Sequence, residues 1–160
     1  MTISGGNTMK KIASFCVDHN KLHPGIYVSR QDGDITTYDI RVCTPNRPPF
    51  MENAVMHTVE HLFATMARNS EYADQVIYFG PMGCRTGFYF LVRDMERSTA
   101  LSLMLSILKE ISVYHGEIPG NSAKECGNYL EHDLPGAVRT VADYYQLVKD
   151  WTPEQLIYPS

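Results

Sequence analysis

Short runs of apolar residues make the first half of the chain rich in predicted strands. Five such runs predict strands at residues 12–17, 26–30, 35–42, 76–79 and 86–93. The second and third runs are joined by residues 31–34, whose Asp-Gly pair is a strong signal for a tight hairpin turn. Prolines within residues 44–49 then end the strand pattern, because proline cannot donate to a sheet ladder.

Elsewhere the apolar residues recur every three or four positions, which is the spacing of a helix. Residues 51–68 carry one such stripe, formed by Val55, Val59, Leu62, Phe63 and Met66. Further helices are predicted at residues 98–114, from residue 121 or 122 through Cys126, and from Pro135 to about Val148, with a last turn at Pro153. Because strands dominate the first half and helices the second, we predict an α+β fold, a two-layer sandwich of an antiparallel sheet packed against helices.

Length and composition agree with one globular domain. The 160 residues suit a single domain, which we expect at residues 12–160 after a flexible lead-in at residues 1–11. Hydrophobic residues make up 44% and charged residues 20%, which argues against a disordered chain. A net charge of −4 offers nucleic acid and anionic membranes no basic surface. No apolar run spans a bilayer and the N-terminus lacks the apolar core of a secretory signal, so we expect a cytoplasmic protein with no membrane or nucleic-acid partner.

The four cysteines add candidate chemistry. In a reducing compartment, metal binding or catalysis is a better interpretation of Cys16, Cys43, Cys84 and Cys126 than disulfide bonding. Each cysteine can equally be a small buried hydrophobic residue. Composition leaves both interpretations open.

The sharpest motif is the run His57-Thr58-Val59-Glu60-His61. Residues four apart on a helix lie on the same face, so His57 and His61 can offer two imidazoles to one metal ion. Glu60 then serves as a base near the ion, as in the inverted motif of some zinc peptidases. A metal needs a third ligand, and Cys126 is the candidate because a thiolate binds borderline divalent ions well. A packed helix residue is the alternative interpretation of Cys126.

Cys84 lies in a glycine-flanked turn beside Arg85. Glycine lets the backbone approach a ligand closely, and a neighbouring cation favours the thiolate. Such a thiol can be partly ionised at neutral pH and able to move protons. From these residues alone, however, we favour the alternative interpretation, a buried and inert thiol.

Several blocks together resemble the S-ribosylhomocysteine lyase (LuxS) family, in one order and across nearly the whole chain after residue 12. The most specific are the His-x-x-Glu-His block and the block Pro81-Met82-Gly83-Cys84-Arg85-Thr86-Gly87. The others are Ser14-Phe15, Asp18-His19, Tyr38-Asp39-Ile40-Arg41, Cys43, Pro45-Asn46, Ile118-Pro119, Cys126-Gly127-Asn128 and His132-Asp133-Leu134.

The resemblance implies a cytoplasmic homodimer with its active sites at the subunit interface. It implies cleavage of S-ribosylhomocysteine to homocysteine and 4,5-dihydroxy-2,3-pentanedione, the precursor of autoinducer-2. The family moves the sugar carbonyl along the ribose with the help of a metal and then eliminates the thiolate. This reaction belongs to the activated methyl cycle and to quorum sensing. The implied cofactor is one Fe²⁺ per subunit, which Zn²⁺ or Co²⁺ can replace, held by His57, His61 and Cys126.

The resemblance also assigns roles to other residues. It implies that Cys84 and Glu60 transfer protons, and it places Ser14, His19 and Arg41 in the substrate pocket. Asp39 and Arg68 match positions near the homocysteine end. Without the resemblance, we would expect a surface ion pair at Arg41, an exposed loop histidine at His19 and a strand hydroxyl at Ser14. We expect the remaining histidines to be structural or exposed, namely His23, His115 and His132.

One block departs from the family pattern. Where the family usually has Ile-Asp-Ile-Ser, this chain has Ile77-Tyr78-Phe79-Gly80. An aspartate at position 78 could pair with the homocysteine ammonium, and tyrosine cannot supply that charge. The alternative function is therefore a metal-binding homodimer of the same fold that acts on, or only binds, a related thioether sugar. A metallopeptidase is a third interpretation, which Cys84 and the short chain disfavour.

Overall fold

The computed structural model describes residues 9–160, so residues 1–8 of the predicted lead-in lie outside the described part. Four antiparallel strands form one sheet in the order β1-β2-β4-β3. They are β1 (Gly25–Asp32), β2 (Ile35–Arg41), β3 (Val76–Pro81) and β4 (Gly87–Arg93). The helices are α1 (Asn53–Arg68), α2 (Arg97–Ser112) and α3 (Leu134–Val148), with short 3₁₀ turns at Ala13–Phe15, Ala73–Gln75 and Pro153–Gln155.

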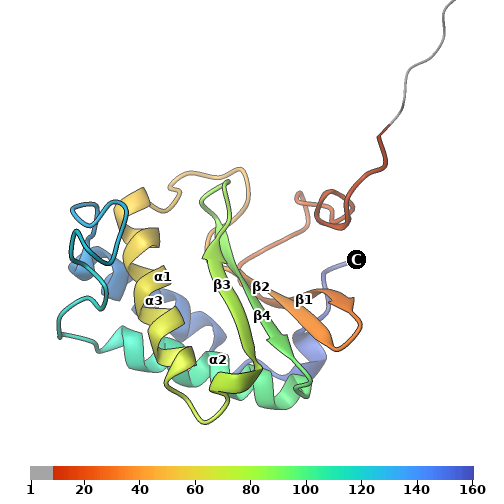
Figure 1. Ribbon diagram of the computed structural model, residues 1–160. Coiled ribbons are helices and arrows are strands. Elements are labelled where there is room, and N and C mark those ends of the chain that lie inside the picture. The colour runs from red at the N-terminus through yellow and green to blue at the C-terminus, as the bar shows by residue number, and fades with distance from the viewer. Residues whose placement is uncertain (1–8) are drawn as a thin grey trace, which may run out of the picture.

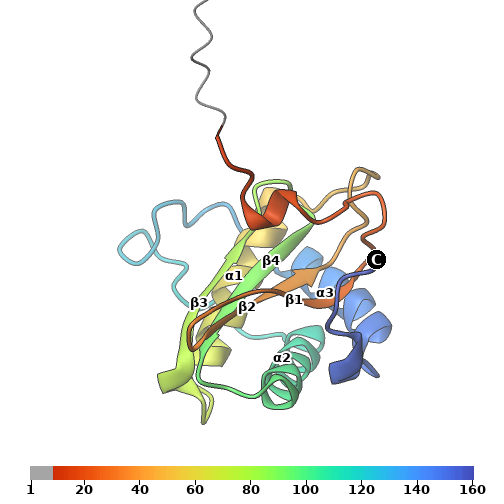
Figure 2. The same ribbon diagram turned by 90° about the vertical axis from the view of Figure 1, so that its right-hand side faces the viewer.

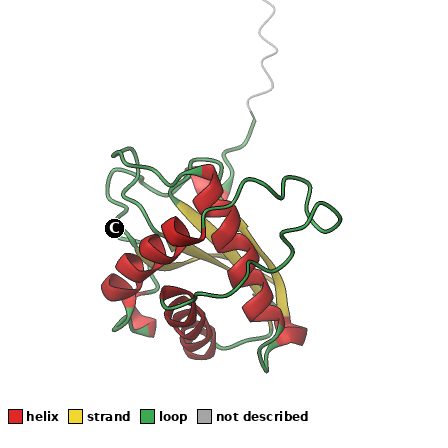
Figure 3. Cartoon of the chain, turned by 90° about the vertical axis from the view of Figure 1, so that its left-hand side faces the viewer, coloured by secondary structure: helices red, strands yellow, loops and turns green. Residues whose placement is uncertain are grey.

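The sheet and the helices form two layers (Figure 1). α1 lies behind the sheet in Figure 2, and α1 and α3 lie in front of it in Figure 3, with α2 below them in both views. The helices therefore gather on one side of the sheet. The α+β sandwich predicted from the sequence is confirmed. None of the helices in residues 9–160 is long and apolar enough to cross a membrane.

The predicted hairpin is the connection between β1 and β2. Asp32 pairs with Ile35, so the turn consists of two residues, and Gly33 takes a positive φ of 60° that glycine adopts without strain. β2 then pairs with β4 along its whole length, from Ile35 opposite Arg93 to Arg41 opposite Gly87. This register places the end of β2 beside the start of β4.

Two predicted elements are wrong. Residues 12–17 form no strand; Ala13–Phe15 is a 3₁₀ turn, and the Phe15 side chain is 66% exposed. This apolar run has no sheet partner to pack against. The helix predicted through Cys126 is also absent, because residues 113–133 contain only turns and irregular backbone. In this segment the amides of Glu125 and Cys126 donate to the Ser122 carbonyl, which closes a single turn that does not continue into a helix.

The core lies between the sheet and the helices and orients α1. The predicted stripe of α1 is buried at Val55, Val59, Leu62 and Phe63. Phe63 stacks on Phe79 of β3 with ring centroids 4.0 Å apart. Because this face of α1 is fixed against the sheet, residues between its buried positions turn away from the core, and they include His57, Glu60 and His61.

Candidate metal centre

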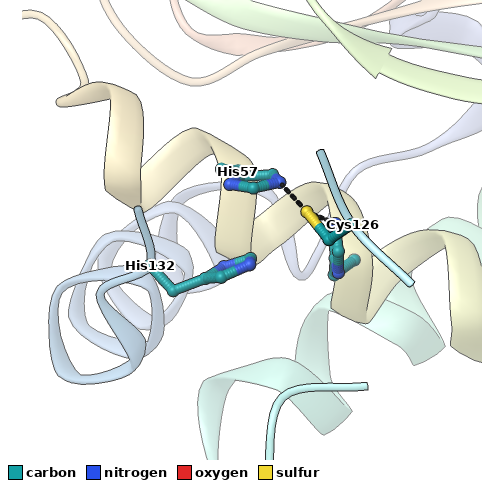
Figure 4. Close-up of side chains that lie close together, drawn as sticks. His57, Cys126 and His132 are labelled. Carbon is teal, nitrogen blue, oxygen red and sulfur yellow. Dashed lines mark hydrogen bonds between the residues drawn. The ribbon is translucent and has the colours of Figure 1, made fainter. Parts of the chain in front are cut away.

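His57 and His61 project from the outward side of α1, one turn apart, with ring centroids 4.6 Å apart. Cys126 reaches them from the irregular segment 113–133. Its Sγ lies 3.3 Å from His57 Nε2 and 3.9 Å from His61 Nε2 (Figure 4). One donor atom from each of these residues and from His132 lies within 4.8 Å of every other. The sequence-predicted ligand set therefore comes together in space.

Backbone carbonyls orient the two predicted histidine ligands. His57 Nδ1 lies 2.8 Å from the Glu131 carbonyl oxygen, and His61 Nδ1 lies 2.8 Å from that of Pro119. Because a carbonyl oxygen only accepts, each Nδ1 carries the proton and each Nε2 lone pair faces the sulfur. Such a second hydrogen bond is typical of metal-ligating histidine. Two neutral imidazoles and a thiolate suit a borderline divalent ion, so the residues present fit the metal.

A glycine lets the segment 113–133 pass close to α1. Gly120 has a positive φ of 69°, a conformation that side-chain-bearing residues rarely adopt. A Cβ built on Gly120 would lie 3.4 Å from His61 Nδ1. A larger residue here would therefore strain the backbone beside the Pro119 carbonyl that holds His61.

His132 is the member of the cluster that sequence reasoning missed. Its ring stacks on His57 with centroids 4.0 Å apart, and its nitrogen-bearing end points toward Cys126 (Figure 4). Burial, with the electrostatic effect of the neighbouring His57 and His61 adding to it, lowers the pKa of His132 to about 4, so the ring is neutral at neutral pH. The available signal was its place directly before Asp133, the residue whose carboxylate caps α3 by accepting from the Gly136 amide.

Thr58 fixes His132 beside the ligands. Its hydroxyl donates to the Ala54 carbonyl at 2.9 Å and accepts from the Asp133 amide at 2.9 Å. His132 Nδ1 lies 3.0 Å from the same oxygen. Because the Thr58 hydroxyl donates its proton to the Ala54 carbonyl, its oxygen accepts from His132 Nδ1. His132 Nε2 then carries no proton and can only accept a hydrogen bond. That Nε2 is buried and has no hydrogen-bond partner within residues 9–160.

Glu60 lies on a cavity next to the cluster. The cavity has a volume of about 330 Å³, and its lining includes Glu60, His61, Tyr78 and Gly120. The Tyr78 side chain is 53% exposed, and its hydroxyl oxygen lies 2.0 Å from the position that a Cβ on Gly80 would take. The two departures from the family pattern are therefore coupled, because the tyrosine ring occupies the space that a side chain at position 80 would need.

Cys84 occupies a second region, the turn between β3 and β4. The thiol is exposed, and the backbone of Arg85 takes a positive φ of 61°. Cys84 Sγ lies 3.1 Å from Thr86 Oγ1 and 3.9 Å from Arg41 Nη1. The Met51 amide donates to the Arg85 carbonyl at 3.1 Å and ties the turn to the segment that leads into α1.

Arg41 forms a buried ion pair with Asp39, which excludes the alternative interpretation of Arg41 as part of a surface ion pair. Arg41 Nη2 donates to Asp39 Oδ2 at 2.7 Å, and the two residues are 2% and 0% exposed. Alternation along β2 turns both side chains to the same side of the sheet. Burial works against the charge on Arg41, but the attraction and hydrogen bond of Asp39 outweigh it and raise the pKa of the guanidinium.

The other predicted site residues lie apart from the cluster in the single chain. Ser14 is half-buried in the N-terminal 3₁₀ turn. His19 is half-buried, lies 2.9 Å from the Val17 carbonyl through Nδ1, and lines a separate cavity with Arg47. Arg68 donates to the carbonyls of Val76 and Ile77 at 3.0 and 2.9 Å, so its guanidinium braces β3 next to Tyr78.

Comparisons with known proteins agree with this geometry. Residues 12–155 match the model of the family described as S-Ribosylhomocysteinase (LuxS). A curated S-ribosylhomocysteine lyase of Borreliella burgdorferi is 48% identical over 157 residues, covering 94% of this chain and 100% of the relative. That of Finegoldia magna is 49% identical over 156 residues, and that of Phocaeicola vulgatus 43% over 159; the matches cover 94% and 95% of this chain and 99% of each relative.

Proposed function

The chain belongs to the S-ribosylhomocysteinase (LuxS) family, and from that premise we propose how its residues share the work of a carbon–sulfur lyase. The enzyme cleaves the thioether of S-ribosylhomocysteine. The observation that carries this function is the convergence of two imidazoles and a cysteine sulfur beside Glu60. A binding protein without activity is not favoured, because these groups are all present and relatives 43–49% identical are lyases. A peptidase is not favoured on the same ground.

His57, His61 and Cys126 would hold one divalent ion per chain, Fe²⁺ in the cell, with Zn²⁺ or Co²⁺ as substitutes. The outward Nε2 lone pairs and the nearby sulfur support this assignment. The bound ion would supply a Lewis acid that polarises a sugar oxygen. The half-buried position of these residues leaves room for a ligand on one side.

Glu60 and Cys84 would transfer protons to and from the sugar carbons. Moving a carbonyl along the ribose removes a proton from one carbon and returns a proton to its neighbour, so the site needs groups that accept and donate at adjacent carbons. Eliminating the thioether removes a proton next to the carbonyl, breaks the carbon–sulfur bond and releases homocysteine as a thiol. The position of Glu60 on the cavity beside His61, and the Arg41 cation beside the Cys84 sulfur, support these roles.

We propose a homodimer in which a second subunit brings Ser14 and His19 to the pocket. In the single chain His19 lines a cavity separate from that of Glu60. Ile12 and Phe15, on either side of Ser14, are 55% and 66% exposed, and a second copy would bury this apolar surface. Asp39 would act through Arg41, and Arg68 would support the homocysteine end through β3.

Residues 12–160 would form a single lyase domain in the cytoplasm, and its product would serve quorum sensing and the activated methyl cycle. All four cysteines are free in the structure, which is the expected state of thiols in a reducing compartment.

The test is thiol release from S-ribosylhomocysteine by anaerobically Fe²⁺-loaded protein. We expect homocysteine release by the wild type, and none by Glu60→Gln or Cys84→Ala although both variants retain metal. Glu71→Gln changes an exposed carboxylate outside the site and should leave release unchanged. Normal turnover by Glu60→Gln or Cys84→Ala would contradict the assigned roles. No release from fully loaded wild type would contradict the function itself.

A further inference from the structure

The C-terminal segment reaches the buried ion pair beneath Cys84. The Leu156 carbonyl accepts from the Val28 amide at 2.7 Å, which lays this segment along β1 (Figures 1 and 2). Tyr158 then stacks on Tyr27 with ring centroids 5.1 Å apart, and its hydroxyl donates to Asp39 Oδ2 at 2.7 Å. Tyr158 of the C-terminal segment therefore contacts the buried ion pair of β2 directly.

Contacts run in series from Tyr158 to the exposed thiol. Asp39 Oδ2 accepts from both Tyr158 and Arg41 Nη2, each at 2.7 Å. The other terminal nitrogen of Arg41 donates to Thr86 at 2.8 Å and lies 3.9 Å from Cys84 Sγ. Asp39 and Cys84 thus face opposite ends of one guanidinium.

This arrangement makes Asp39 and Cys84 competitors for one positive charge. As the negative charge on Asp39 increases, it cancels more of the positive potential that Arg41 produces at the Cys84 sulfur. A hydroxyl that donates to Asp39 disperses that charge. Burial, with the charge of Asp39 adding to it, raises the pKa of Tyr158, so the phenol stays protonated and remains a donor.

We propose that Tyr158 is a positioning residue for Cys84: by donating to Asp39, it leaves the charge of Arg41 available to the thiol. The proposal deepens the proton-transfer role of Cys84 given above, and it assigns the C-terminal segment a part in the reaction. The charged and titratable groups around this thiol and its partners are Arg41 and Asp39 of β2, Cys43 just beyond that strand, Arg85 in the turn, Tyr89 of β4 and Tyr158.

The test measures the reactivity of Cys84 without turnover. Zinc-loaded protein is treated with iodoacetamide at a series of pH values, and alkylation at each cysteine is followed by peptide mass spectrometry. Tyr158→Phe keeps the ring that stacks on Tyr27 and removes only the hydroxyl. We expect alkylation of Cys84 at neutral pH to slow about threefold, half a logarithmic unit, and the alkylation curve to move to higher pH.

Asp39→Asn should act in the opposite direction, because it removes the competing charge, and it should speed alkylation of Cys84. A merely structural role would make both variants change in the same direction. Tyr145→Phe, which changes a partly buried tyrosine of α3, should leave the curve unchanged. Cys16 is an exposed reference thiol in the same molecule.

A Tyr158→Phe curve that coincides with wild type would overturn the proposal, as would equal slowing at Cys84 and Cys16. If Asp39→Asn does not fold, the comparison of Tyr158→Phe with Tyr145→Phe still tests the proposal. Since alkylation needs no substrate, a failure here is separate from a failure of the lyase function in the thiol-release assay.

Discussion

The metal cluster and the Cys84 region are built in different ways. The cluster of His57, His61, Cys126 and His132 joins a helix to an irregular segment, and all four residues are half-buried. Beneath Cys84, by contrast, the Asp39–Arg41 pair is buried on one face of the sheet, where Tyr158 contacts it. Strand pairing from Ile35 to Arg41 positions that pair without any ligand.

The difference teaches which part of the site depends on its cofactor. Segment 113–133 has no helix or strand, so the contacts of Cys126, Glu131 and Pro119 with the two histidines of α1 hold it in place. An ion bound there would add its binding free energy to the order of this segment. The Cys84 region is formed by the sheet itself, and we expect it to persist in the metal-free protein.

Replacing the predicted ligand Cys126 should show the largest difference between the two regions, measured as metal content. In Cys126→Ala the thiolate is lost, and we expect metal retained after dialysis to fall from about one equivalent per chain to near zero, with lyase activity lost. Cys43→Ala alters a half-buried cysteine of the other region and should retain its metal. Elemental analysis of both variants measures the effect. Full metal content in Cys126→Ala would exclude Cys126 as a ligand.

Breaking the buried pair should have the next largest effect, on stability rather than on metal. Arg41→Met leaves the Asp39 carboxylate buried and unpaired, so we expect the free energy of unfolding to fall by about 3–5 kcal/mol. Arg30→Met breaks the exposed Arg30–Asp32 pair and should remain close to wild type, because solvent screens such pairs. Urea unfolding of the zinc-loaded proteins compares them. Equal stability of the two variants would mean that the sheet does not depend on the buried pair.

The sequence predicted α1 and its two histidines because a helical stripe fixes which side chains face outward. The apolar residues Val55, Val59 and Phe63 determine the buried side, and His57 and His61 then lie together by geometry. The proximity of these two histidines was therefore predictable from periodicity.

The same reasoning failed where no periodic pattern exists. The helix predicted through Cys126 is absent, and the position of His132 depends on the Thr58 hydroxyl, a contact between residues 74 apart in the chain. The burial of Arg41 was also missed. Its partner Asp39 lies two residues away on the same strand, but Tyr158, which contacts this pair, lies far away near residue 160. Such contacts arise from tertiary packing, which local sequence patterns do not record.

Metal removal should loosen one region and leave the other intact. Lys124 is exposed within the segment that carries Cys126, whereas Arg85 lies in the turn beside Cys84. After chelation we expect trypsin to cut after Lys124 on the order of tenfold faster, equivalent to about 1.4 kcal/mol of lost local stability. Cleavage after Arg85 should not change, because sheet pairing holds that turn. Mass spectrometry of the early fragments distinguishes the two sites, and equal acceleration at both would contradict the comparison.

Alkaline pH should test the Cys84 region by a smaller effect. Burial, with Asp39 adding to it, raises the pKa of Tyr27 to about 12, and the pKa values of Tyr144 and Tyr158 are raised for the same reasons. The unfolded chain loses these phenol protons near pH 10. The phenols therefore contribute stability that is fully present below about pH 10 and is lost as the pH rises toward about 12.

Urea unfolding of zinc-loaded protein at increasing alkaline pH measures that decline. Other groups titrate in the same range, so the informative quantity is the difference between variants. Tyr158→Phe removes one raised phenol and should show a shallower decline than wild type, whereas Tyr129→Phe, at an exposed position of segment 113–133, should decline in parallel with it. Identical slopes for Tyr158→Phe and wild type would mean that Asp39 does not act on the Tyr158 phenol. The buried carboxylate would then be isolated from the C-terminal segment that covers it.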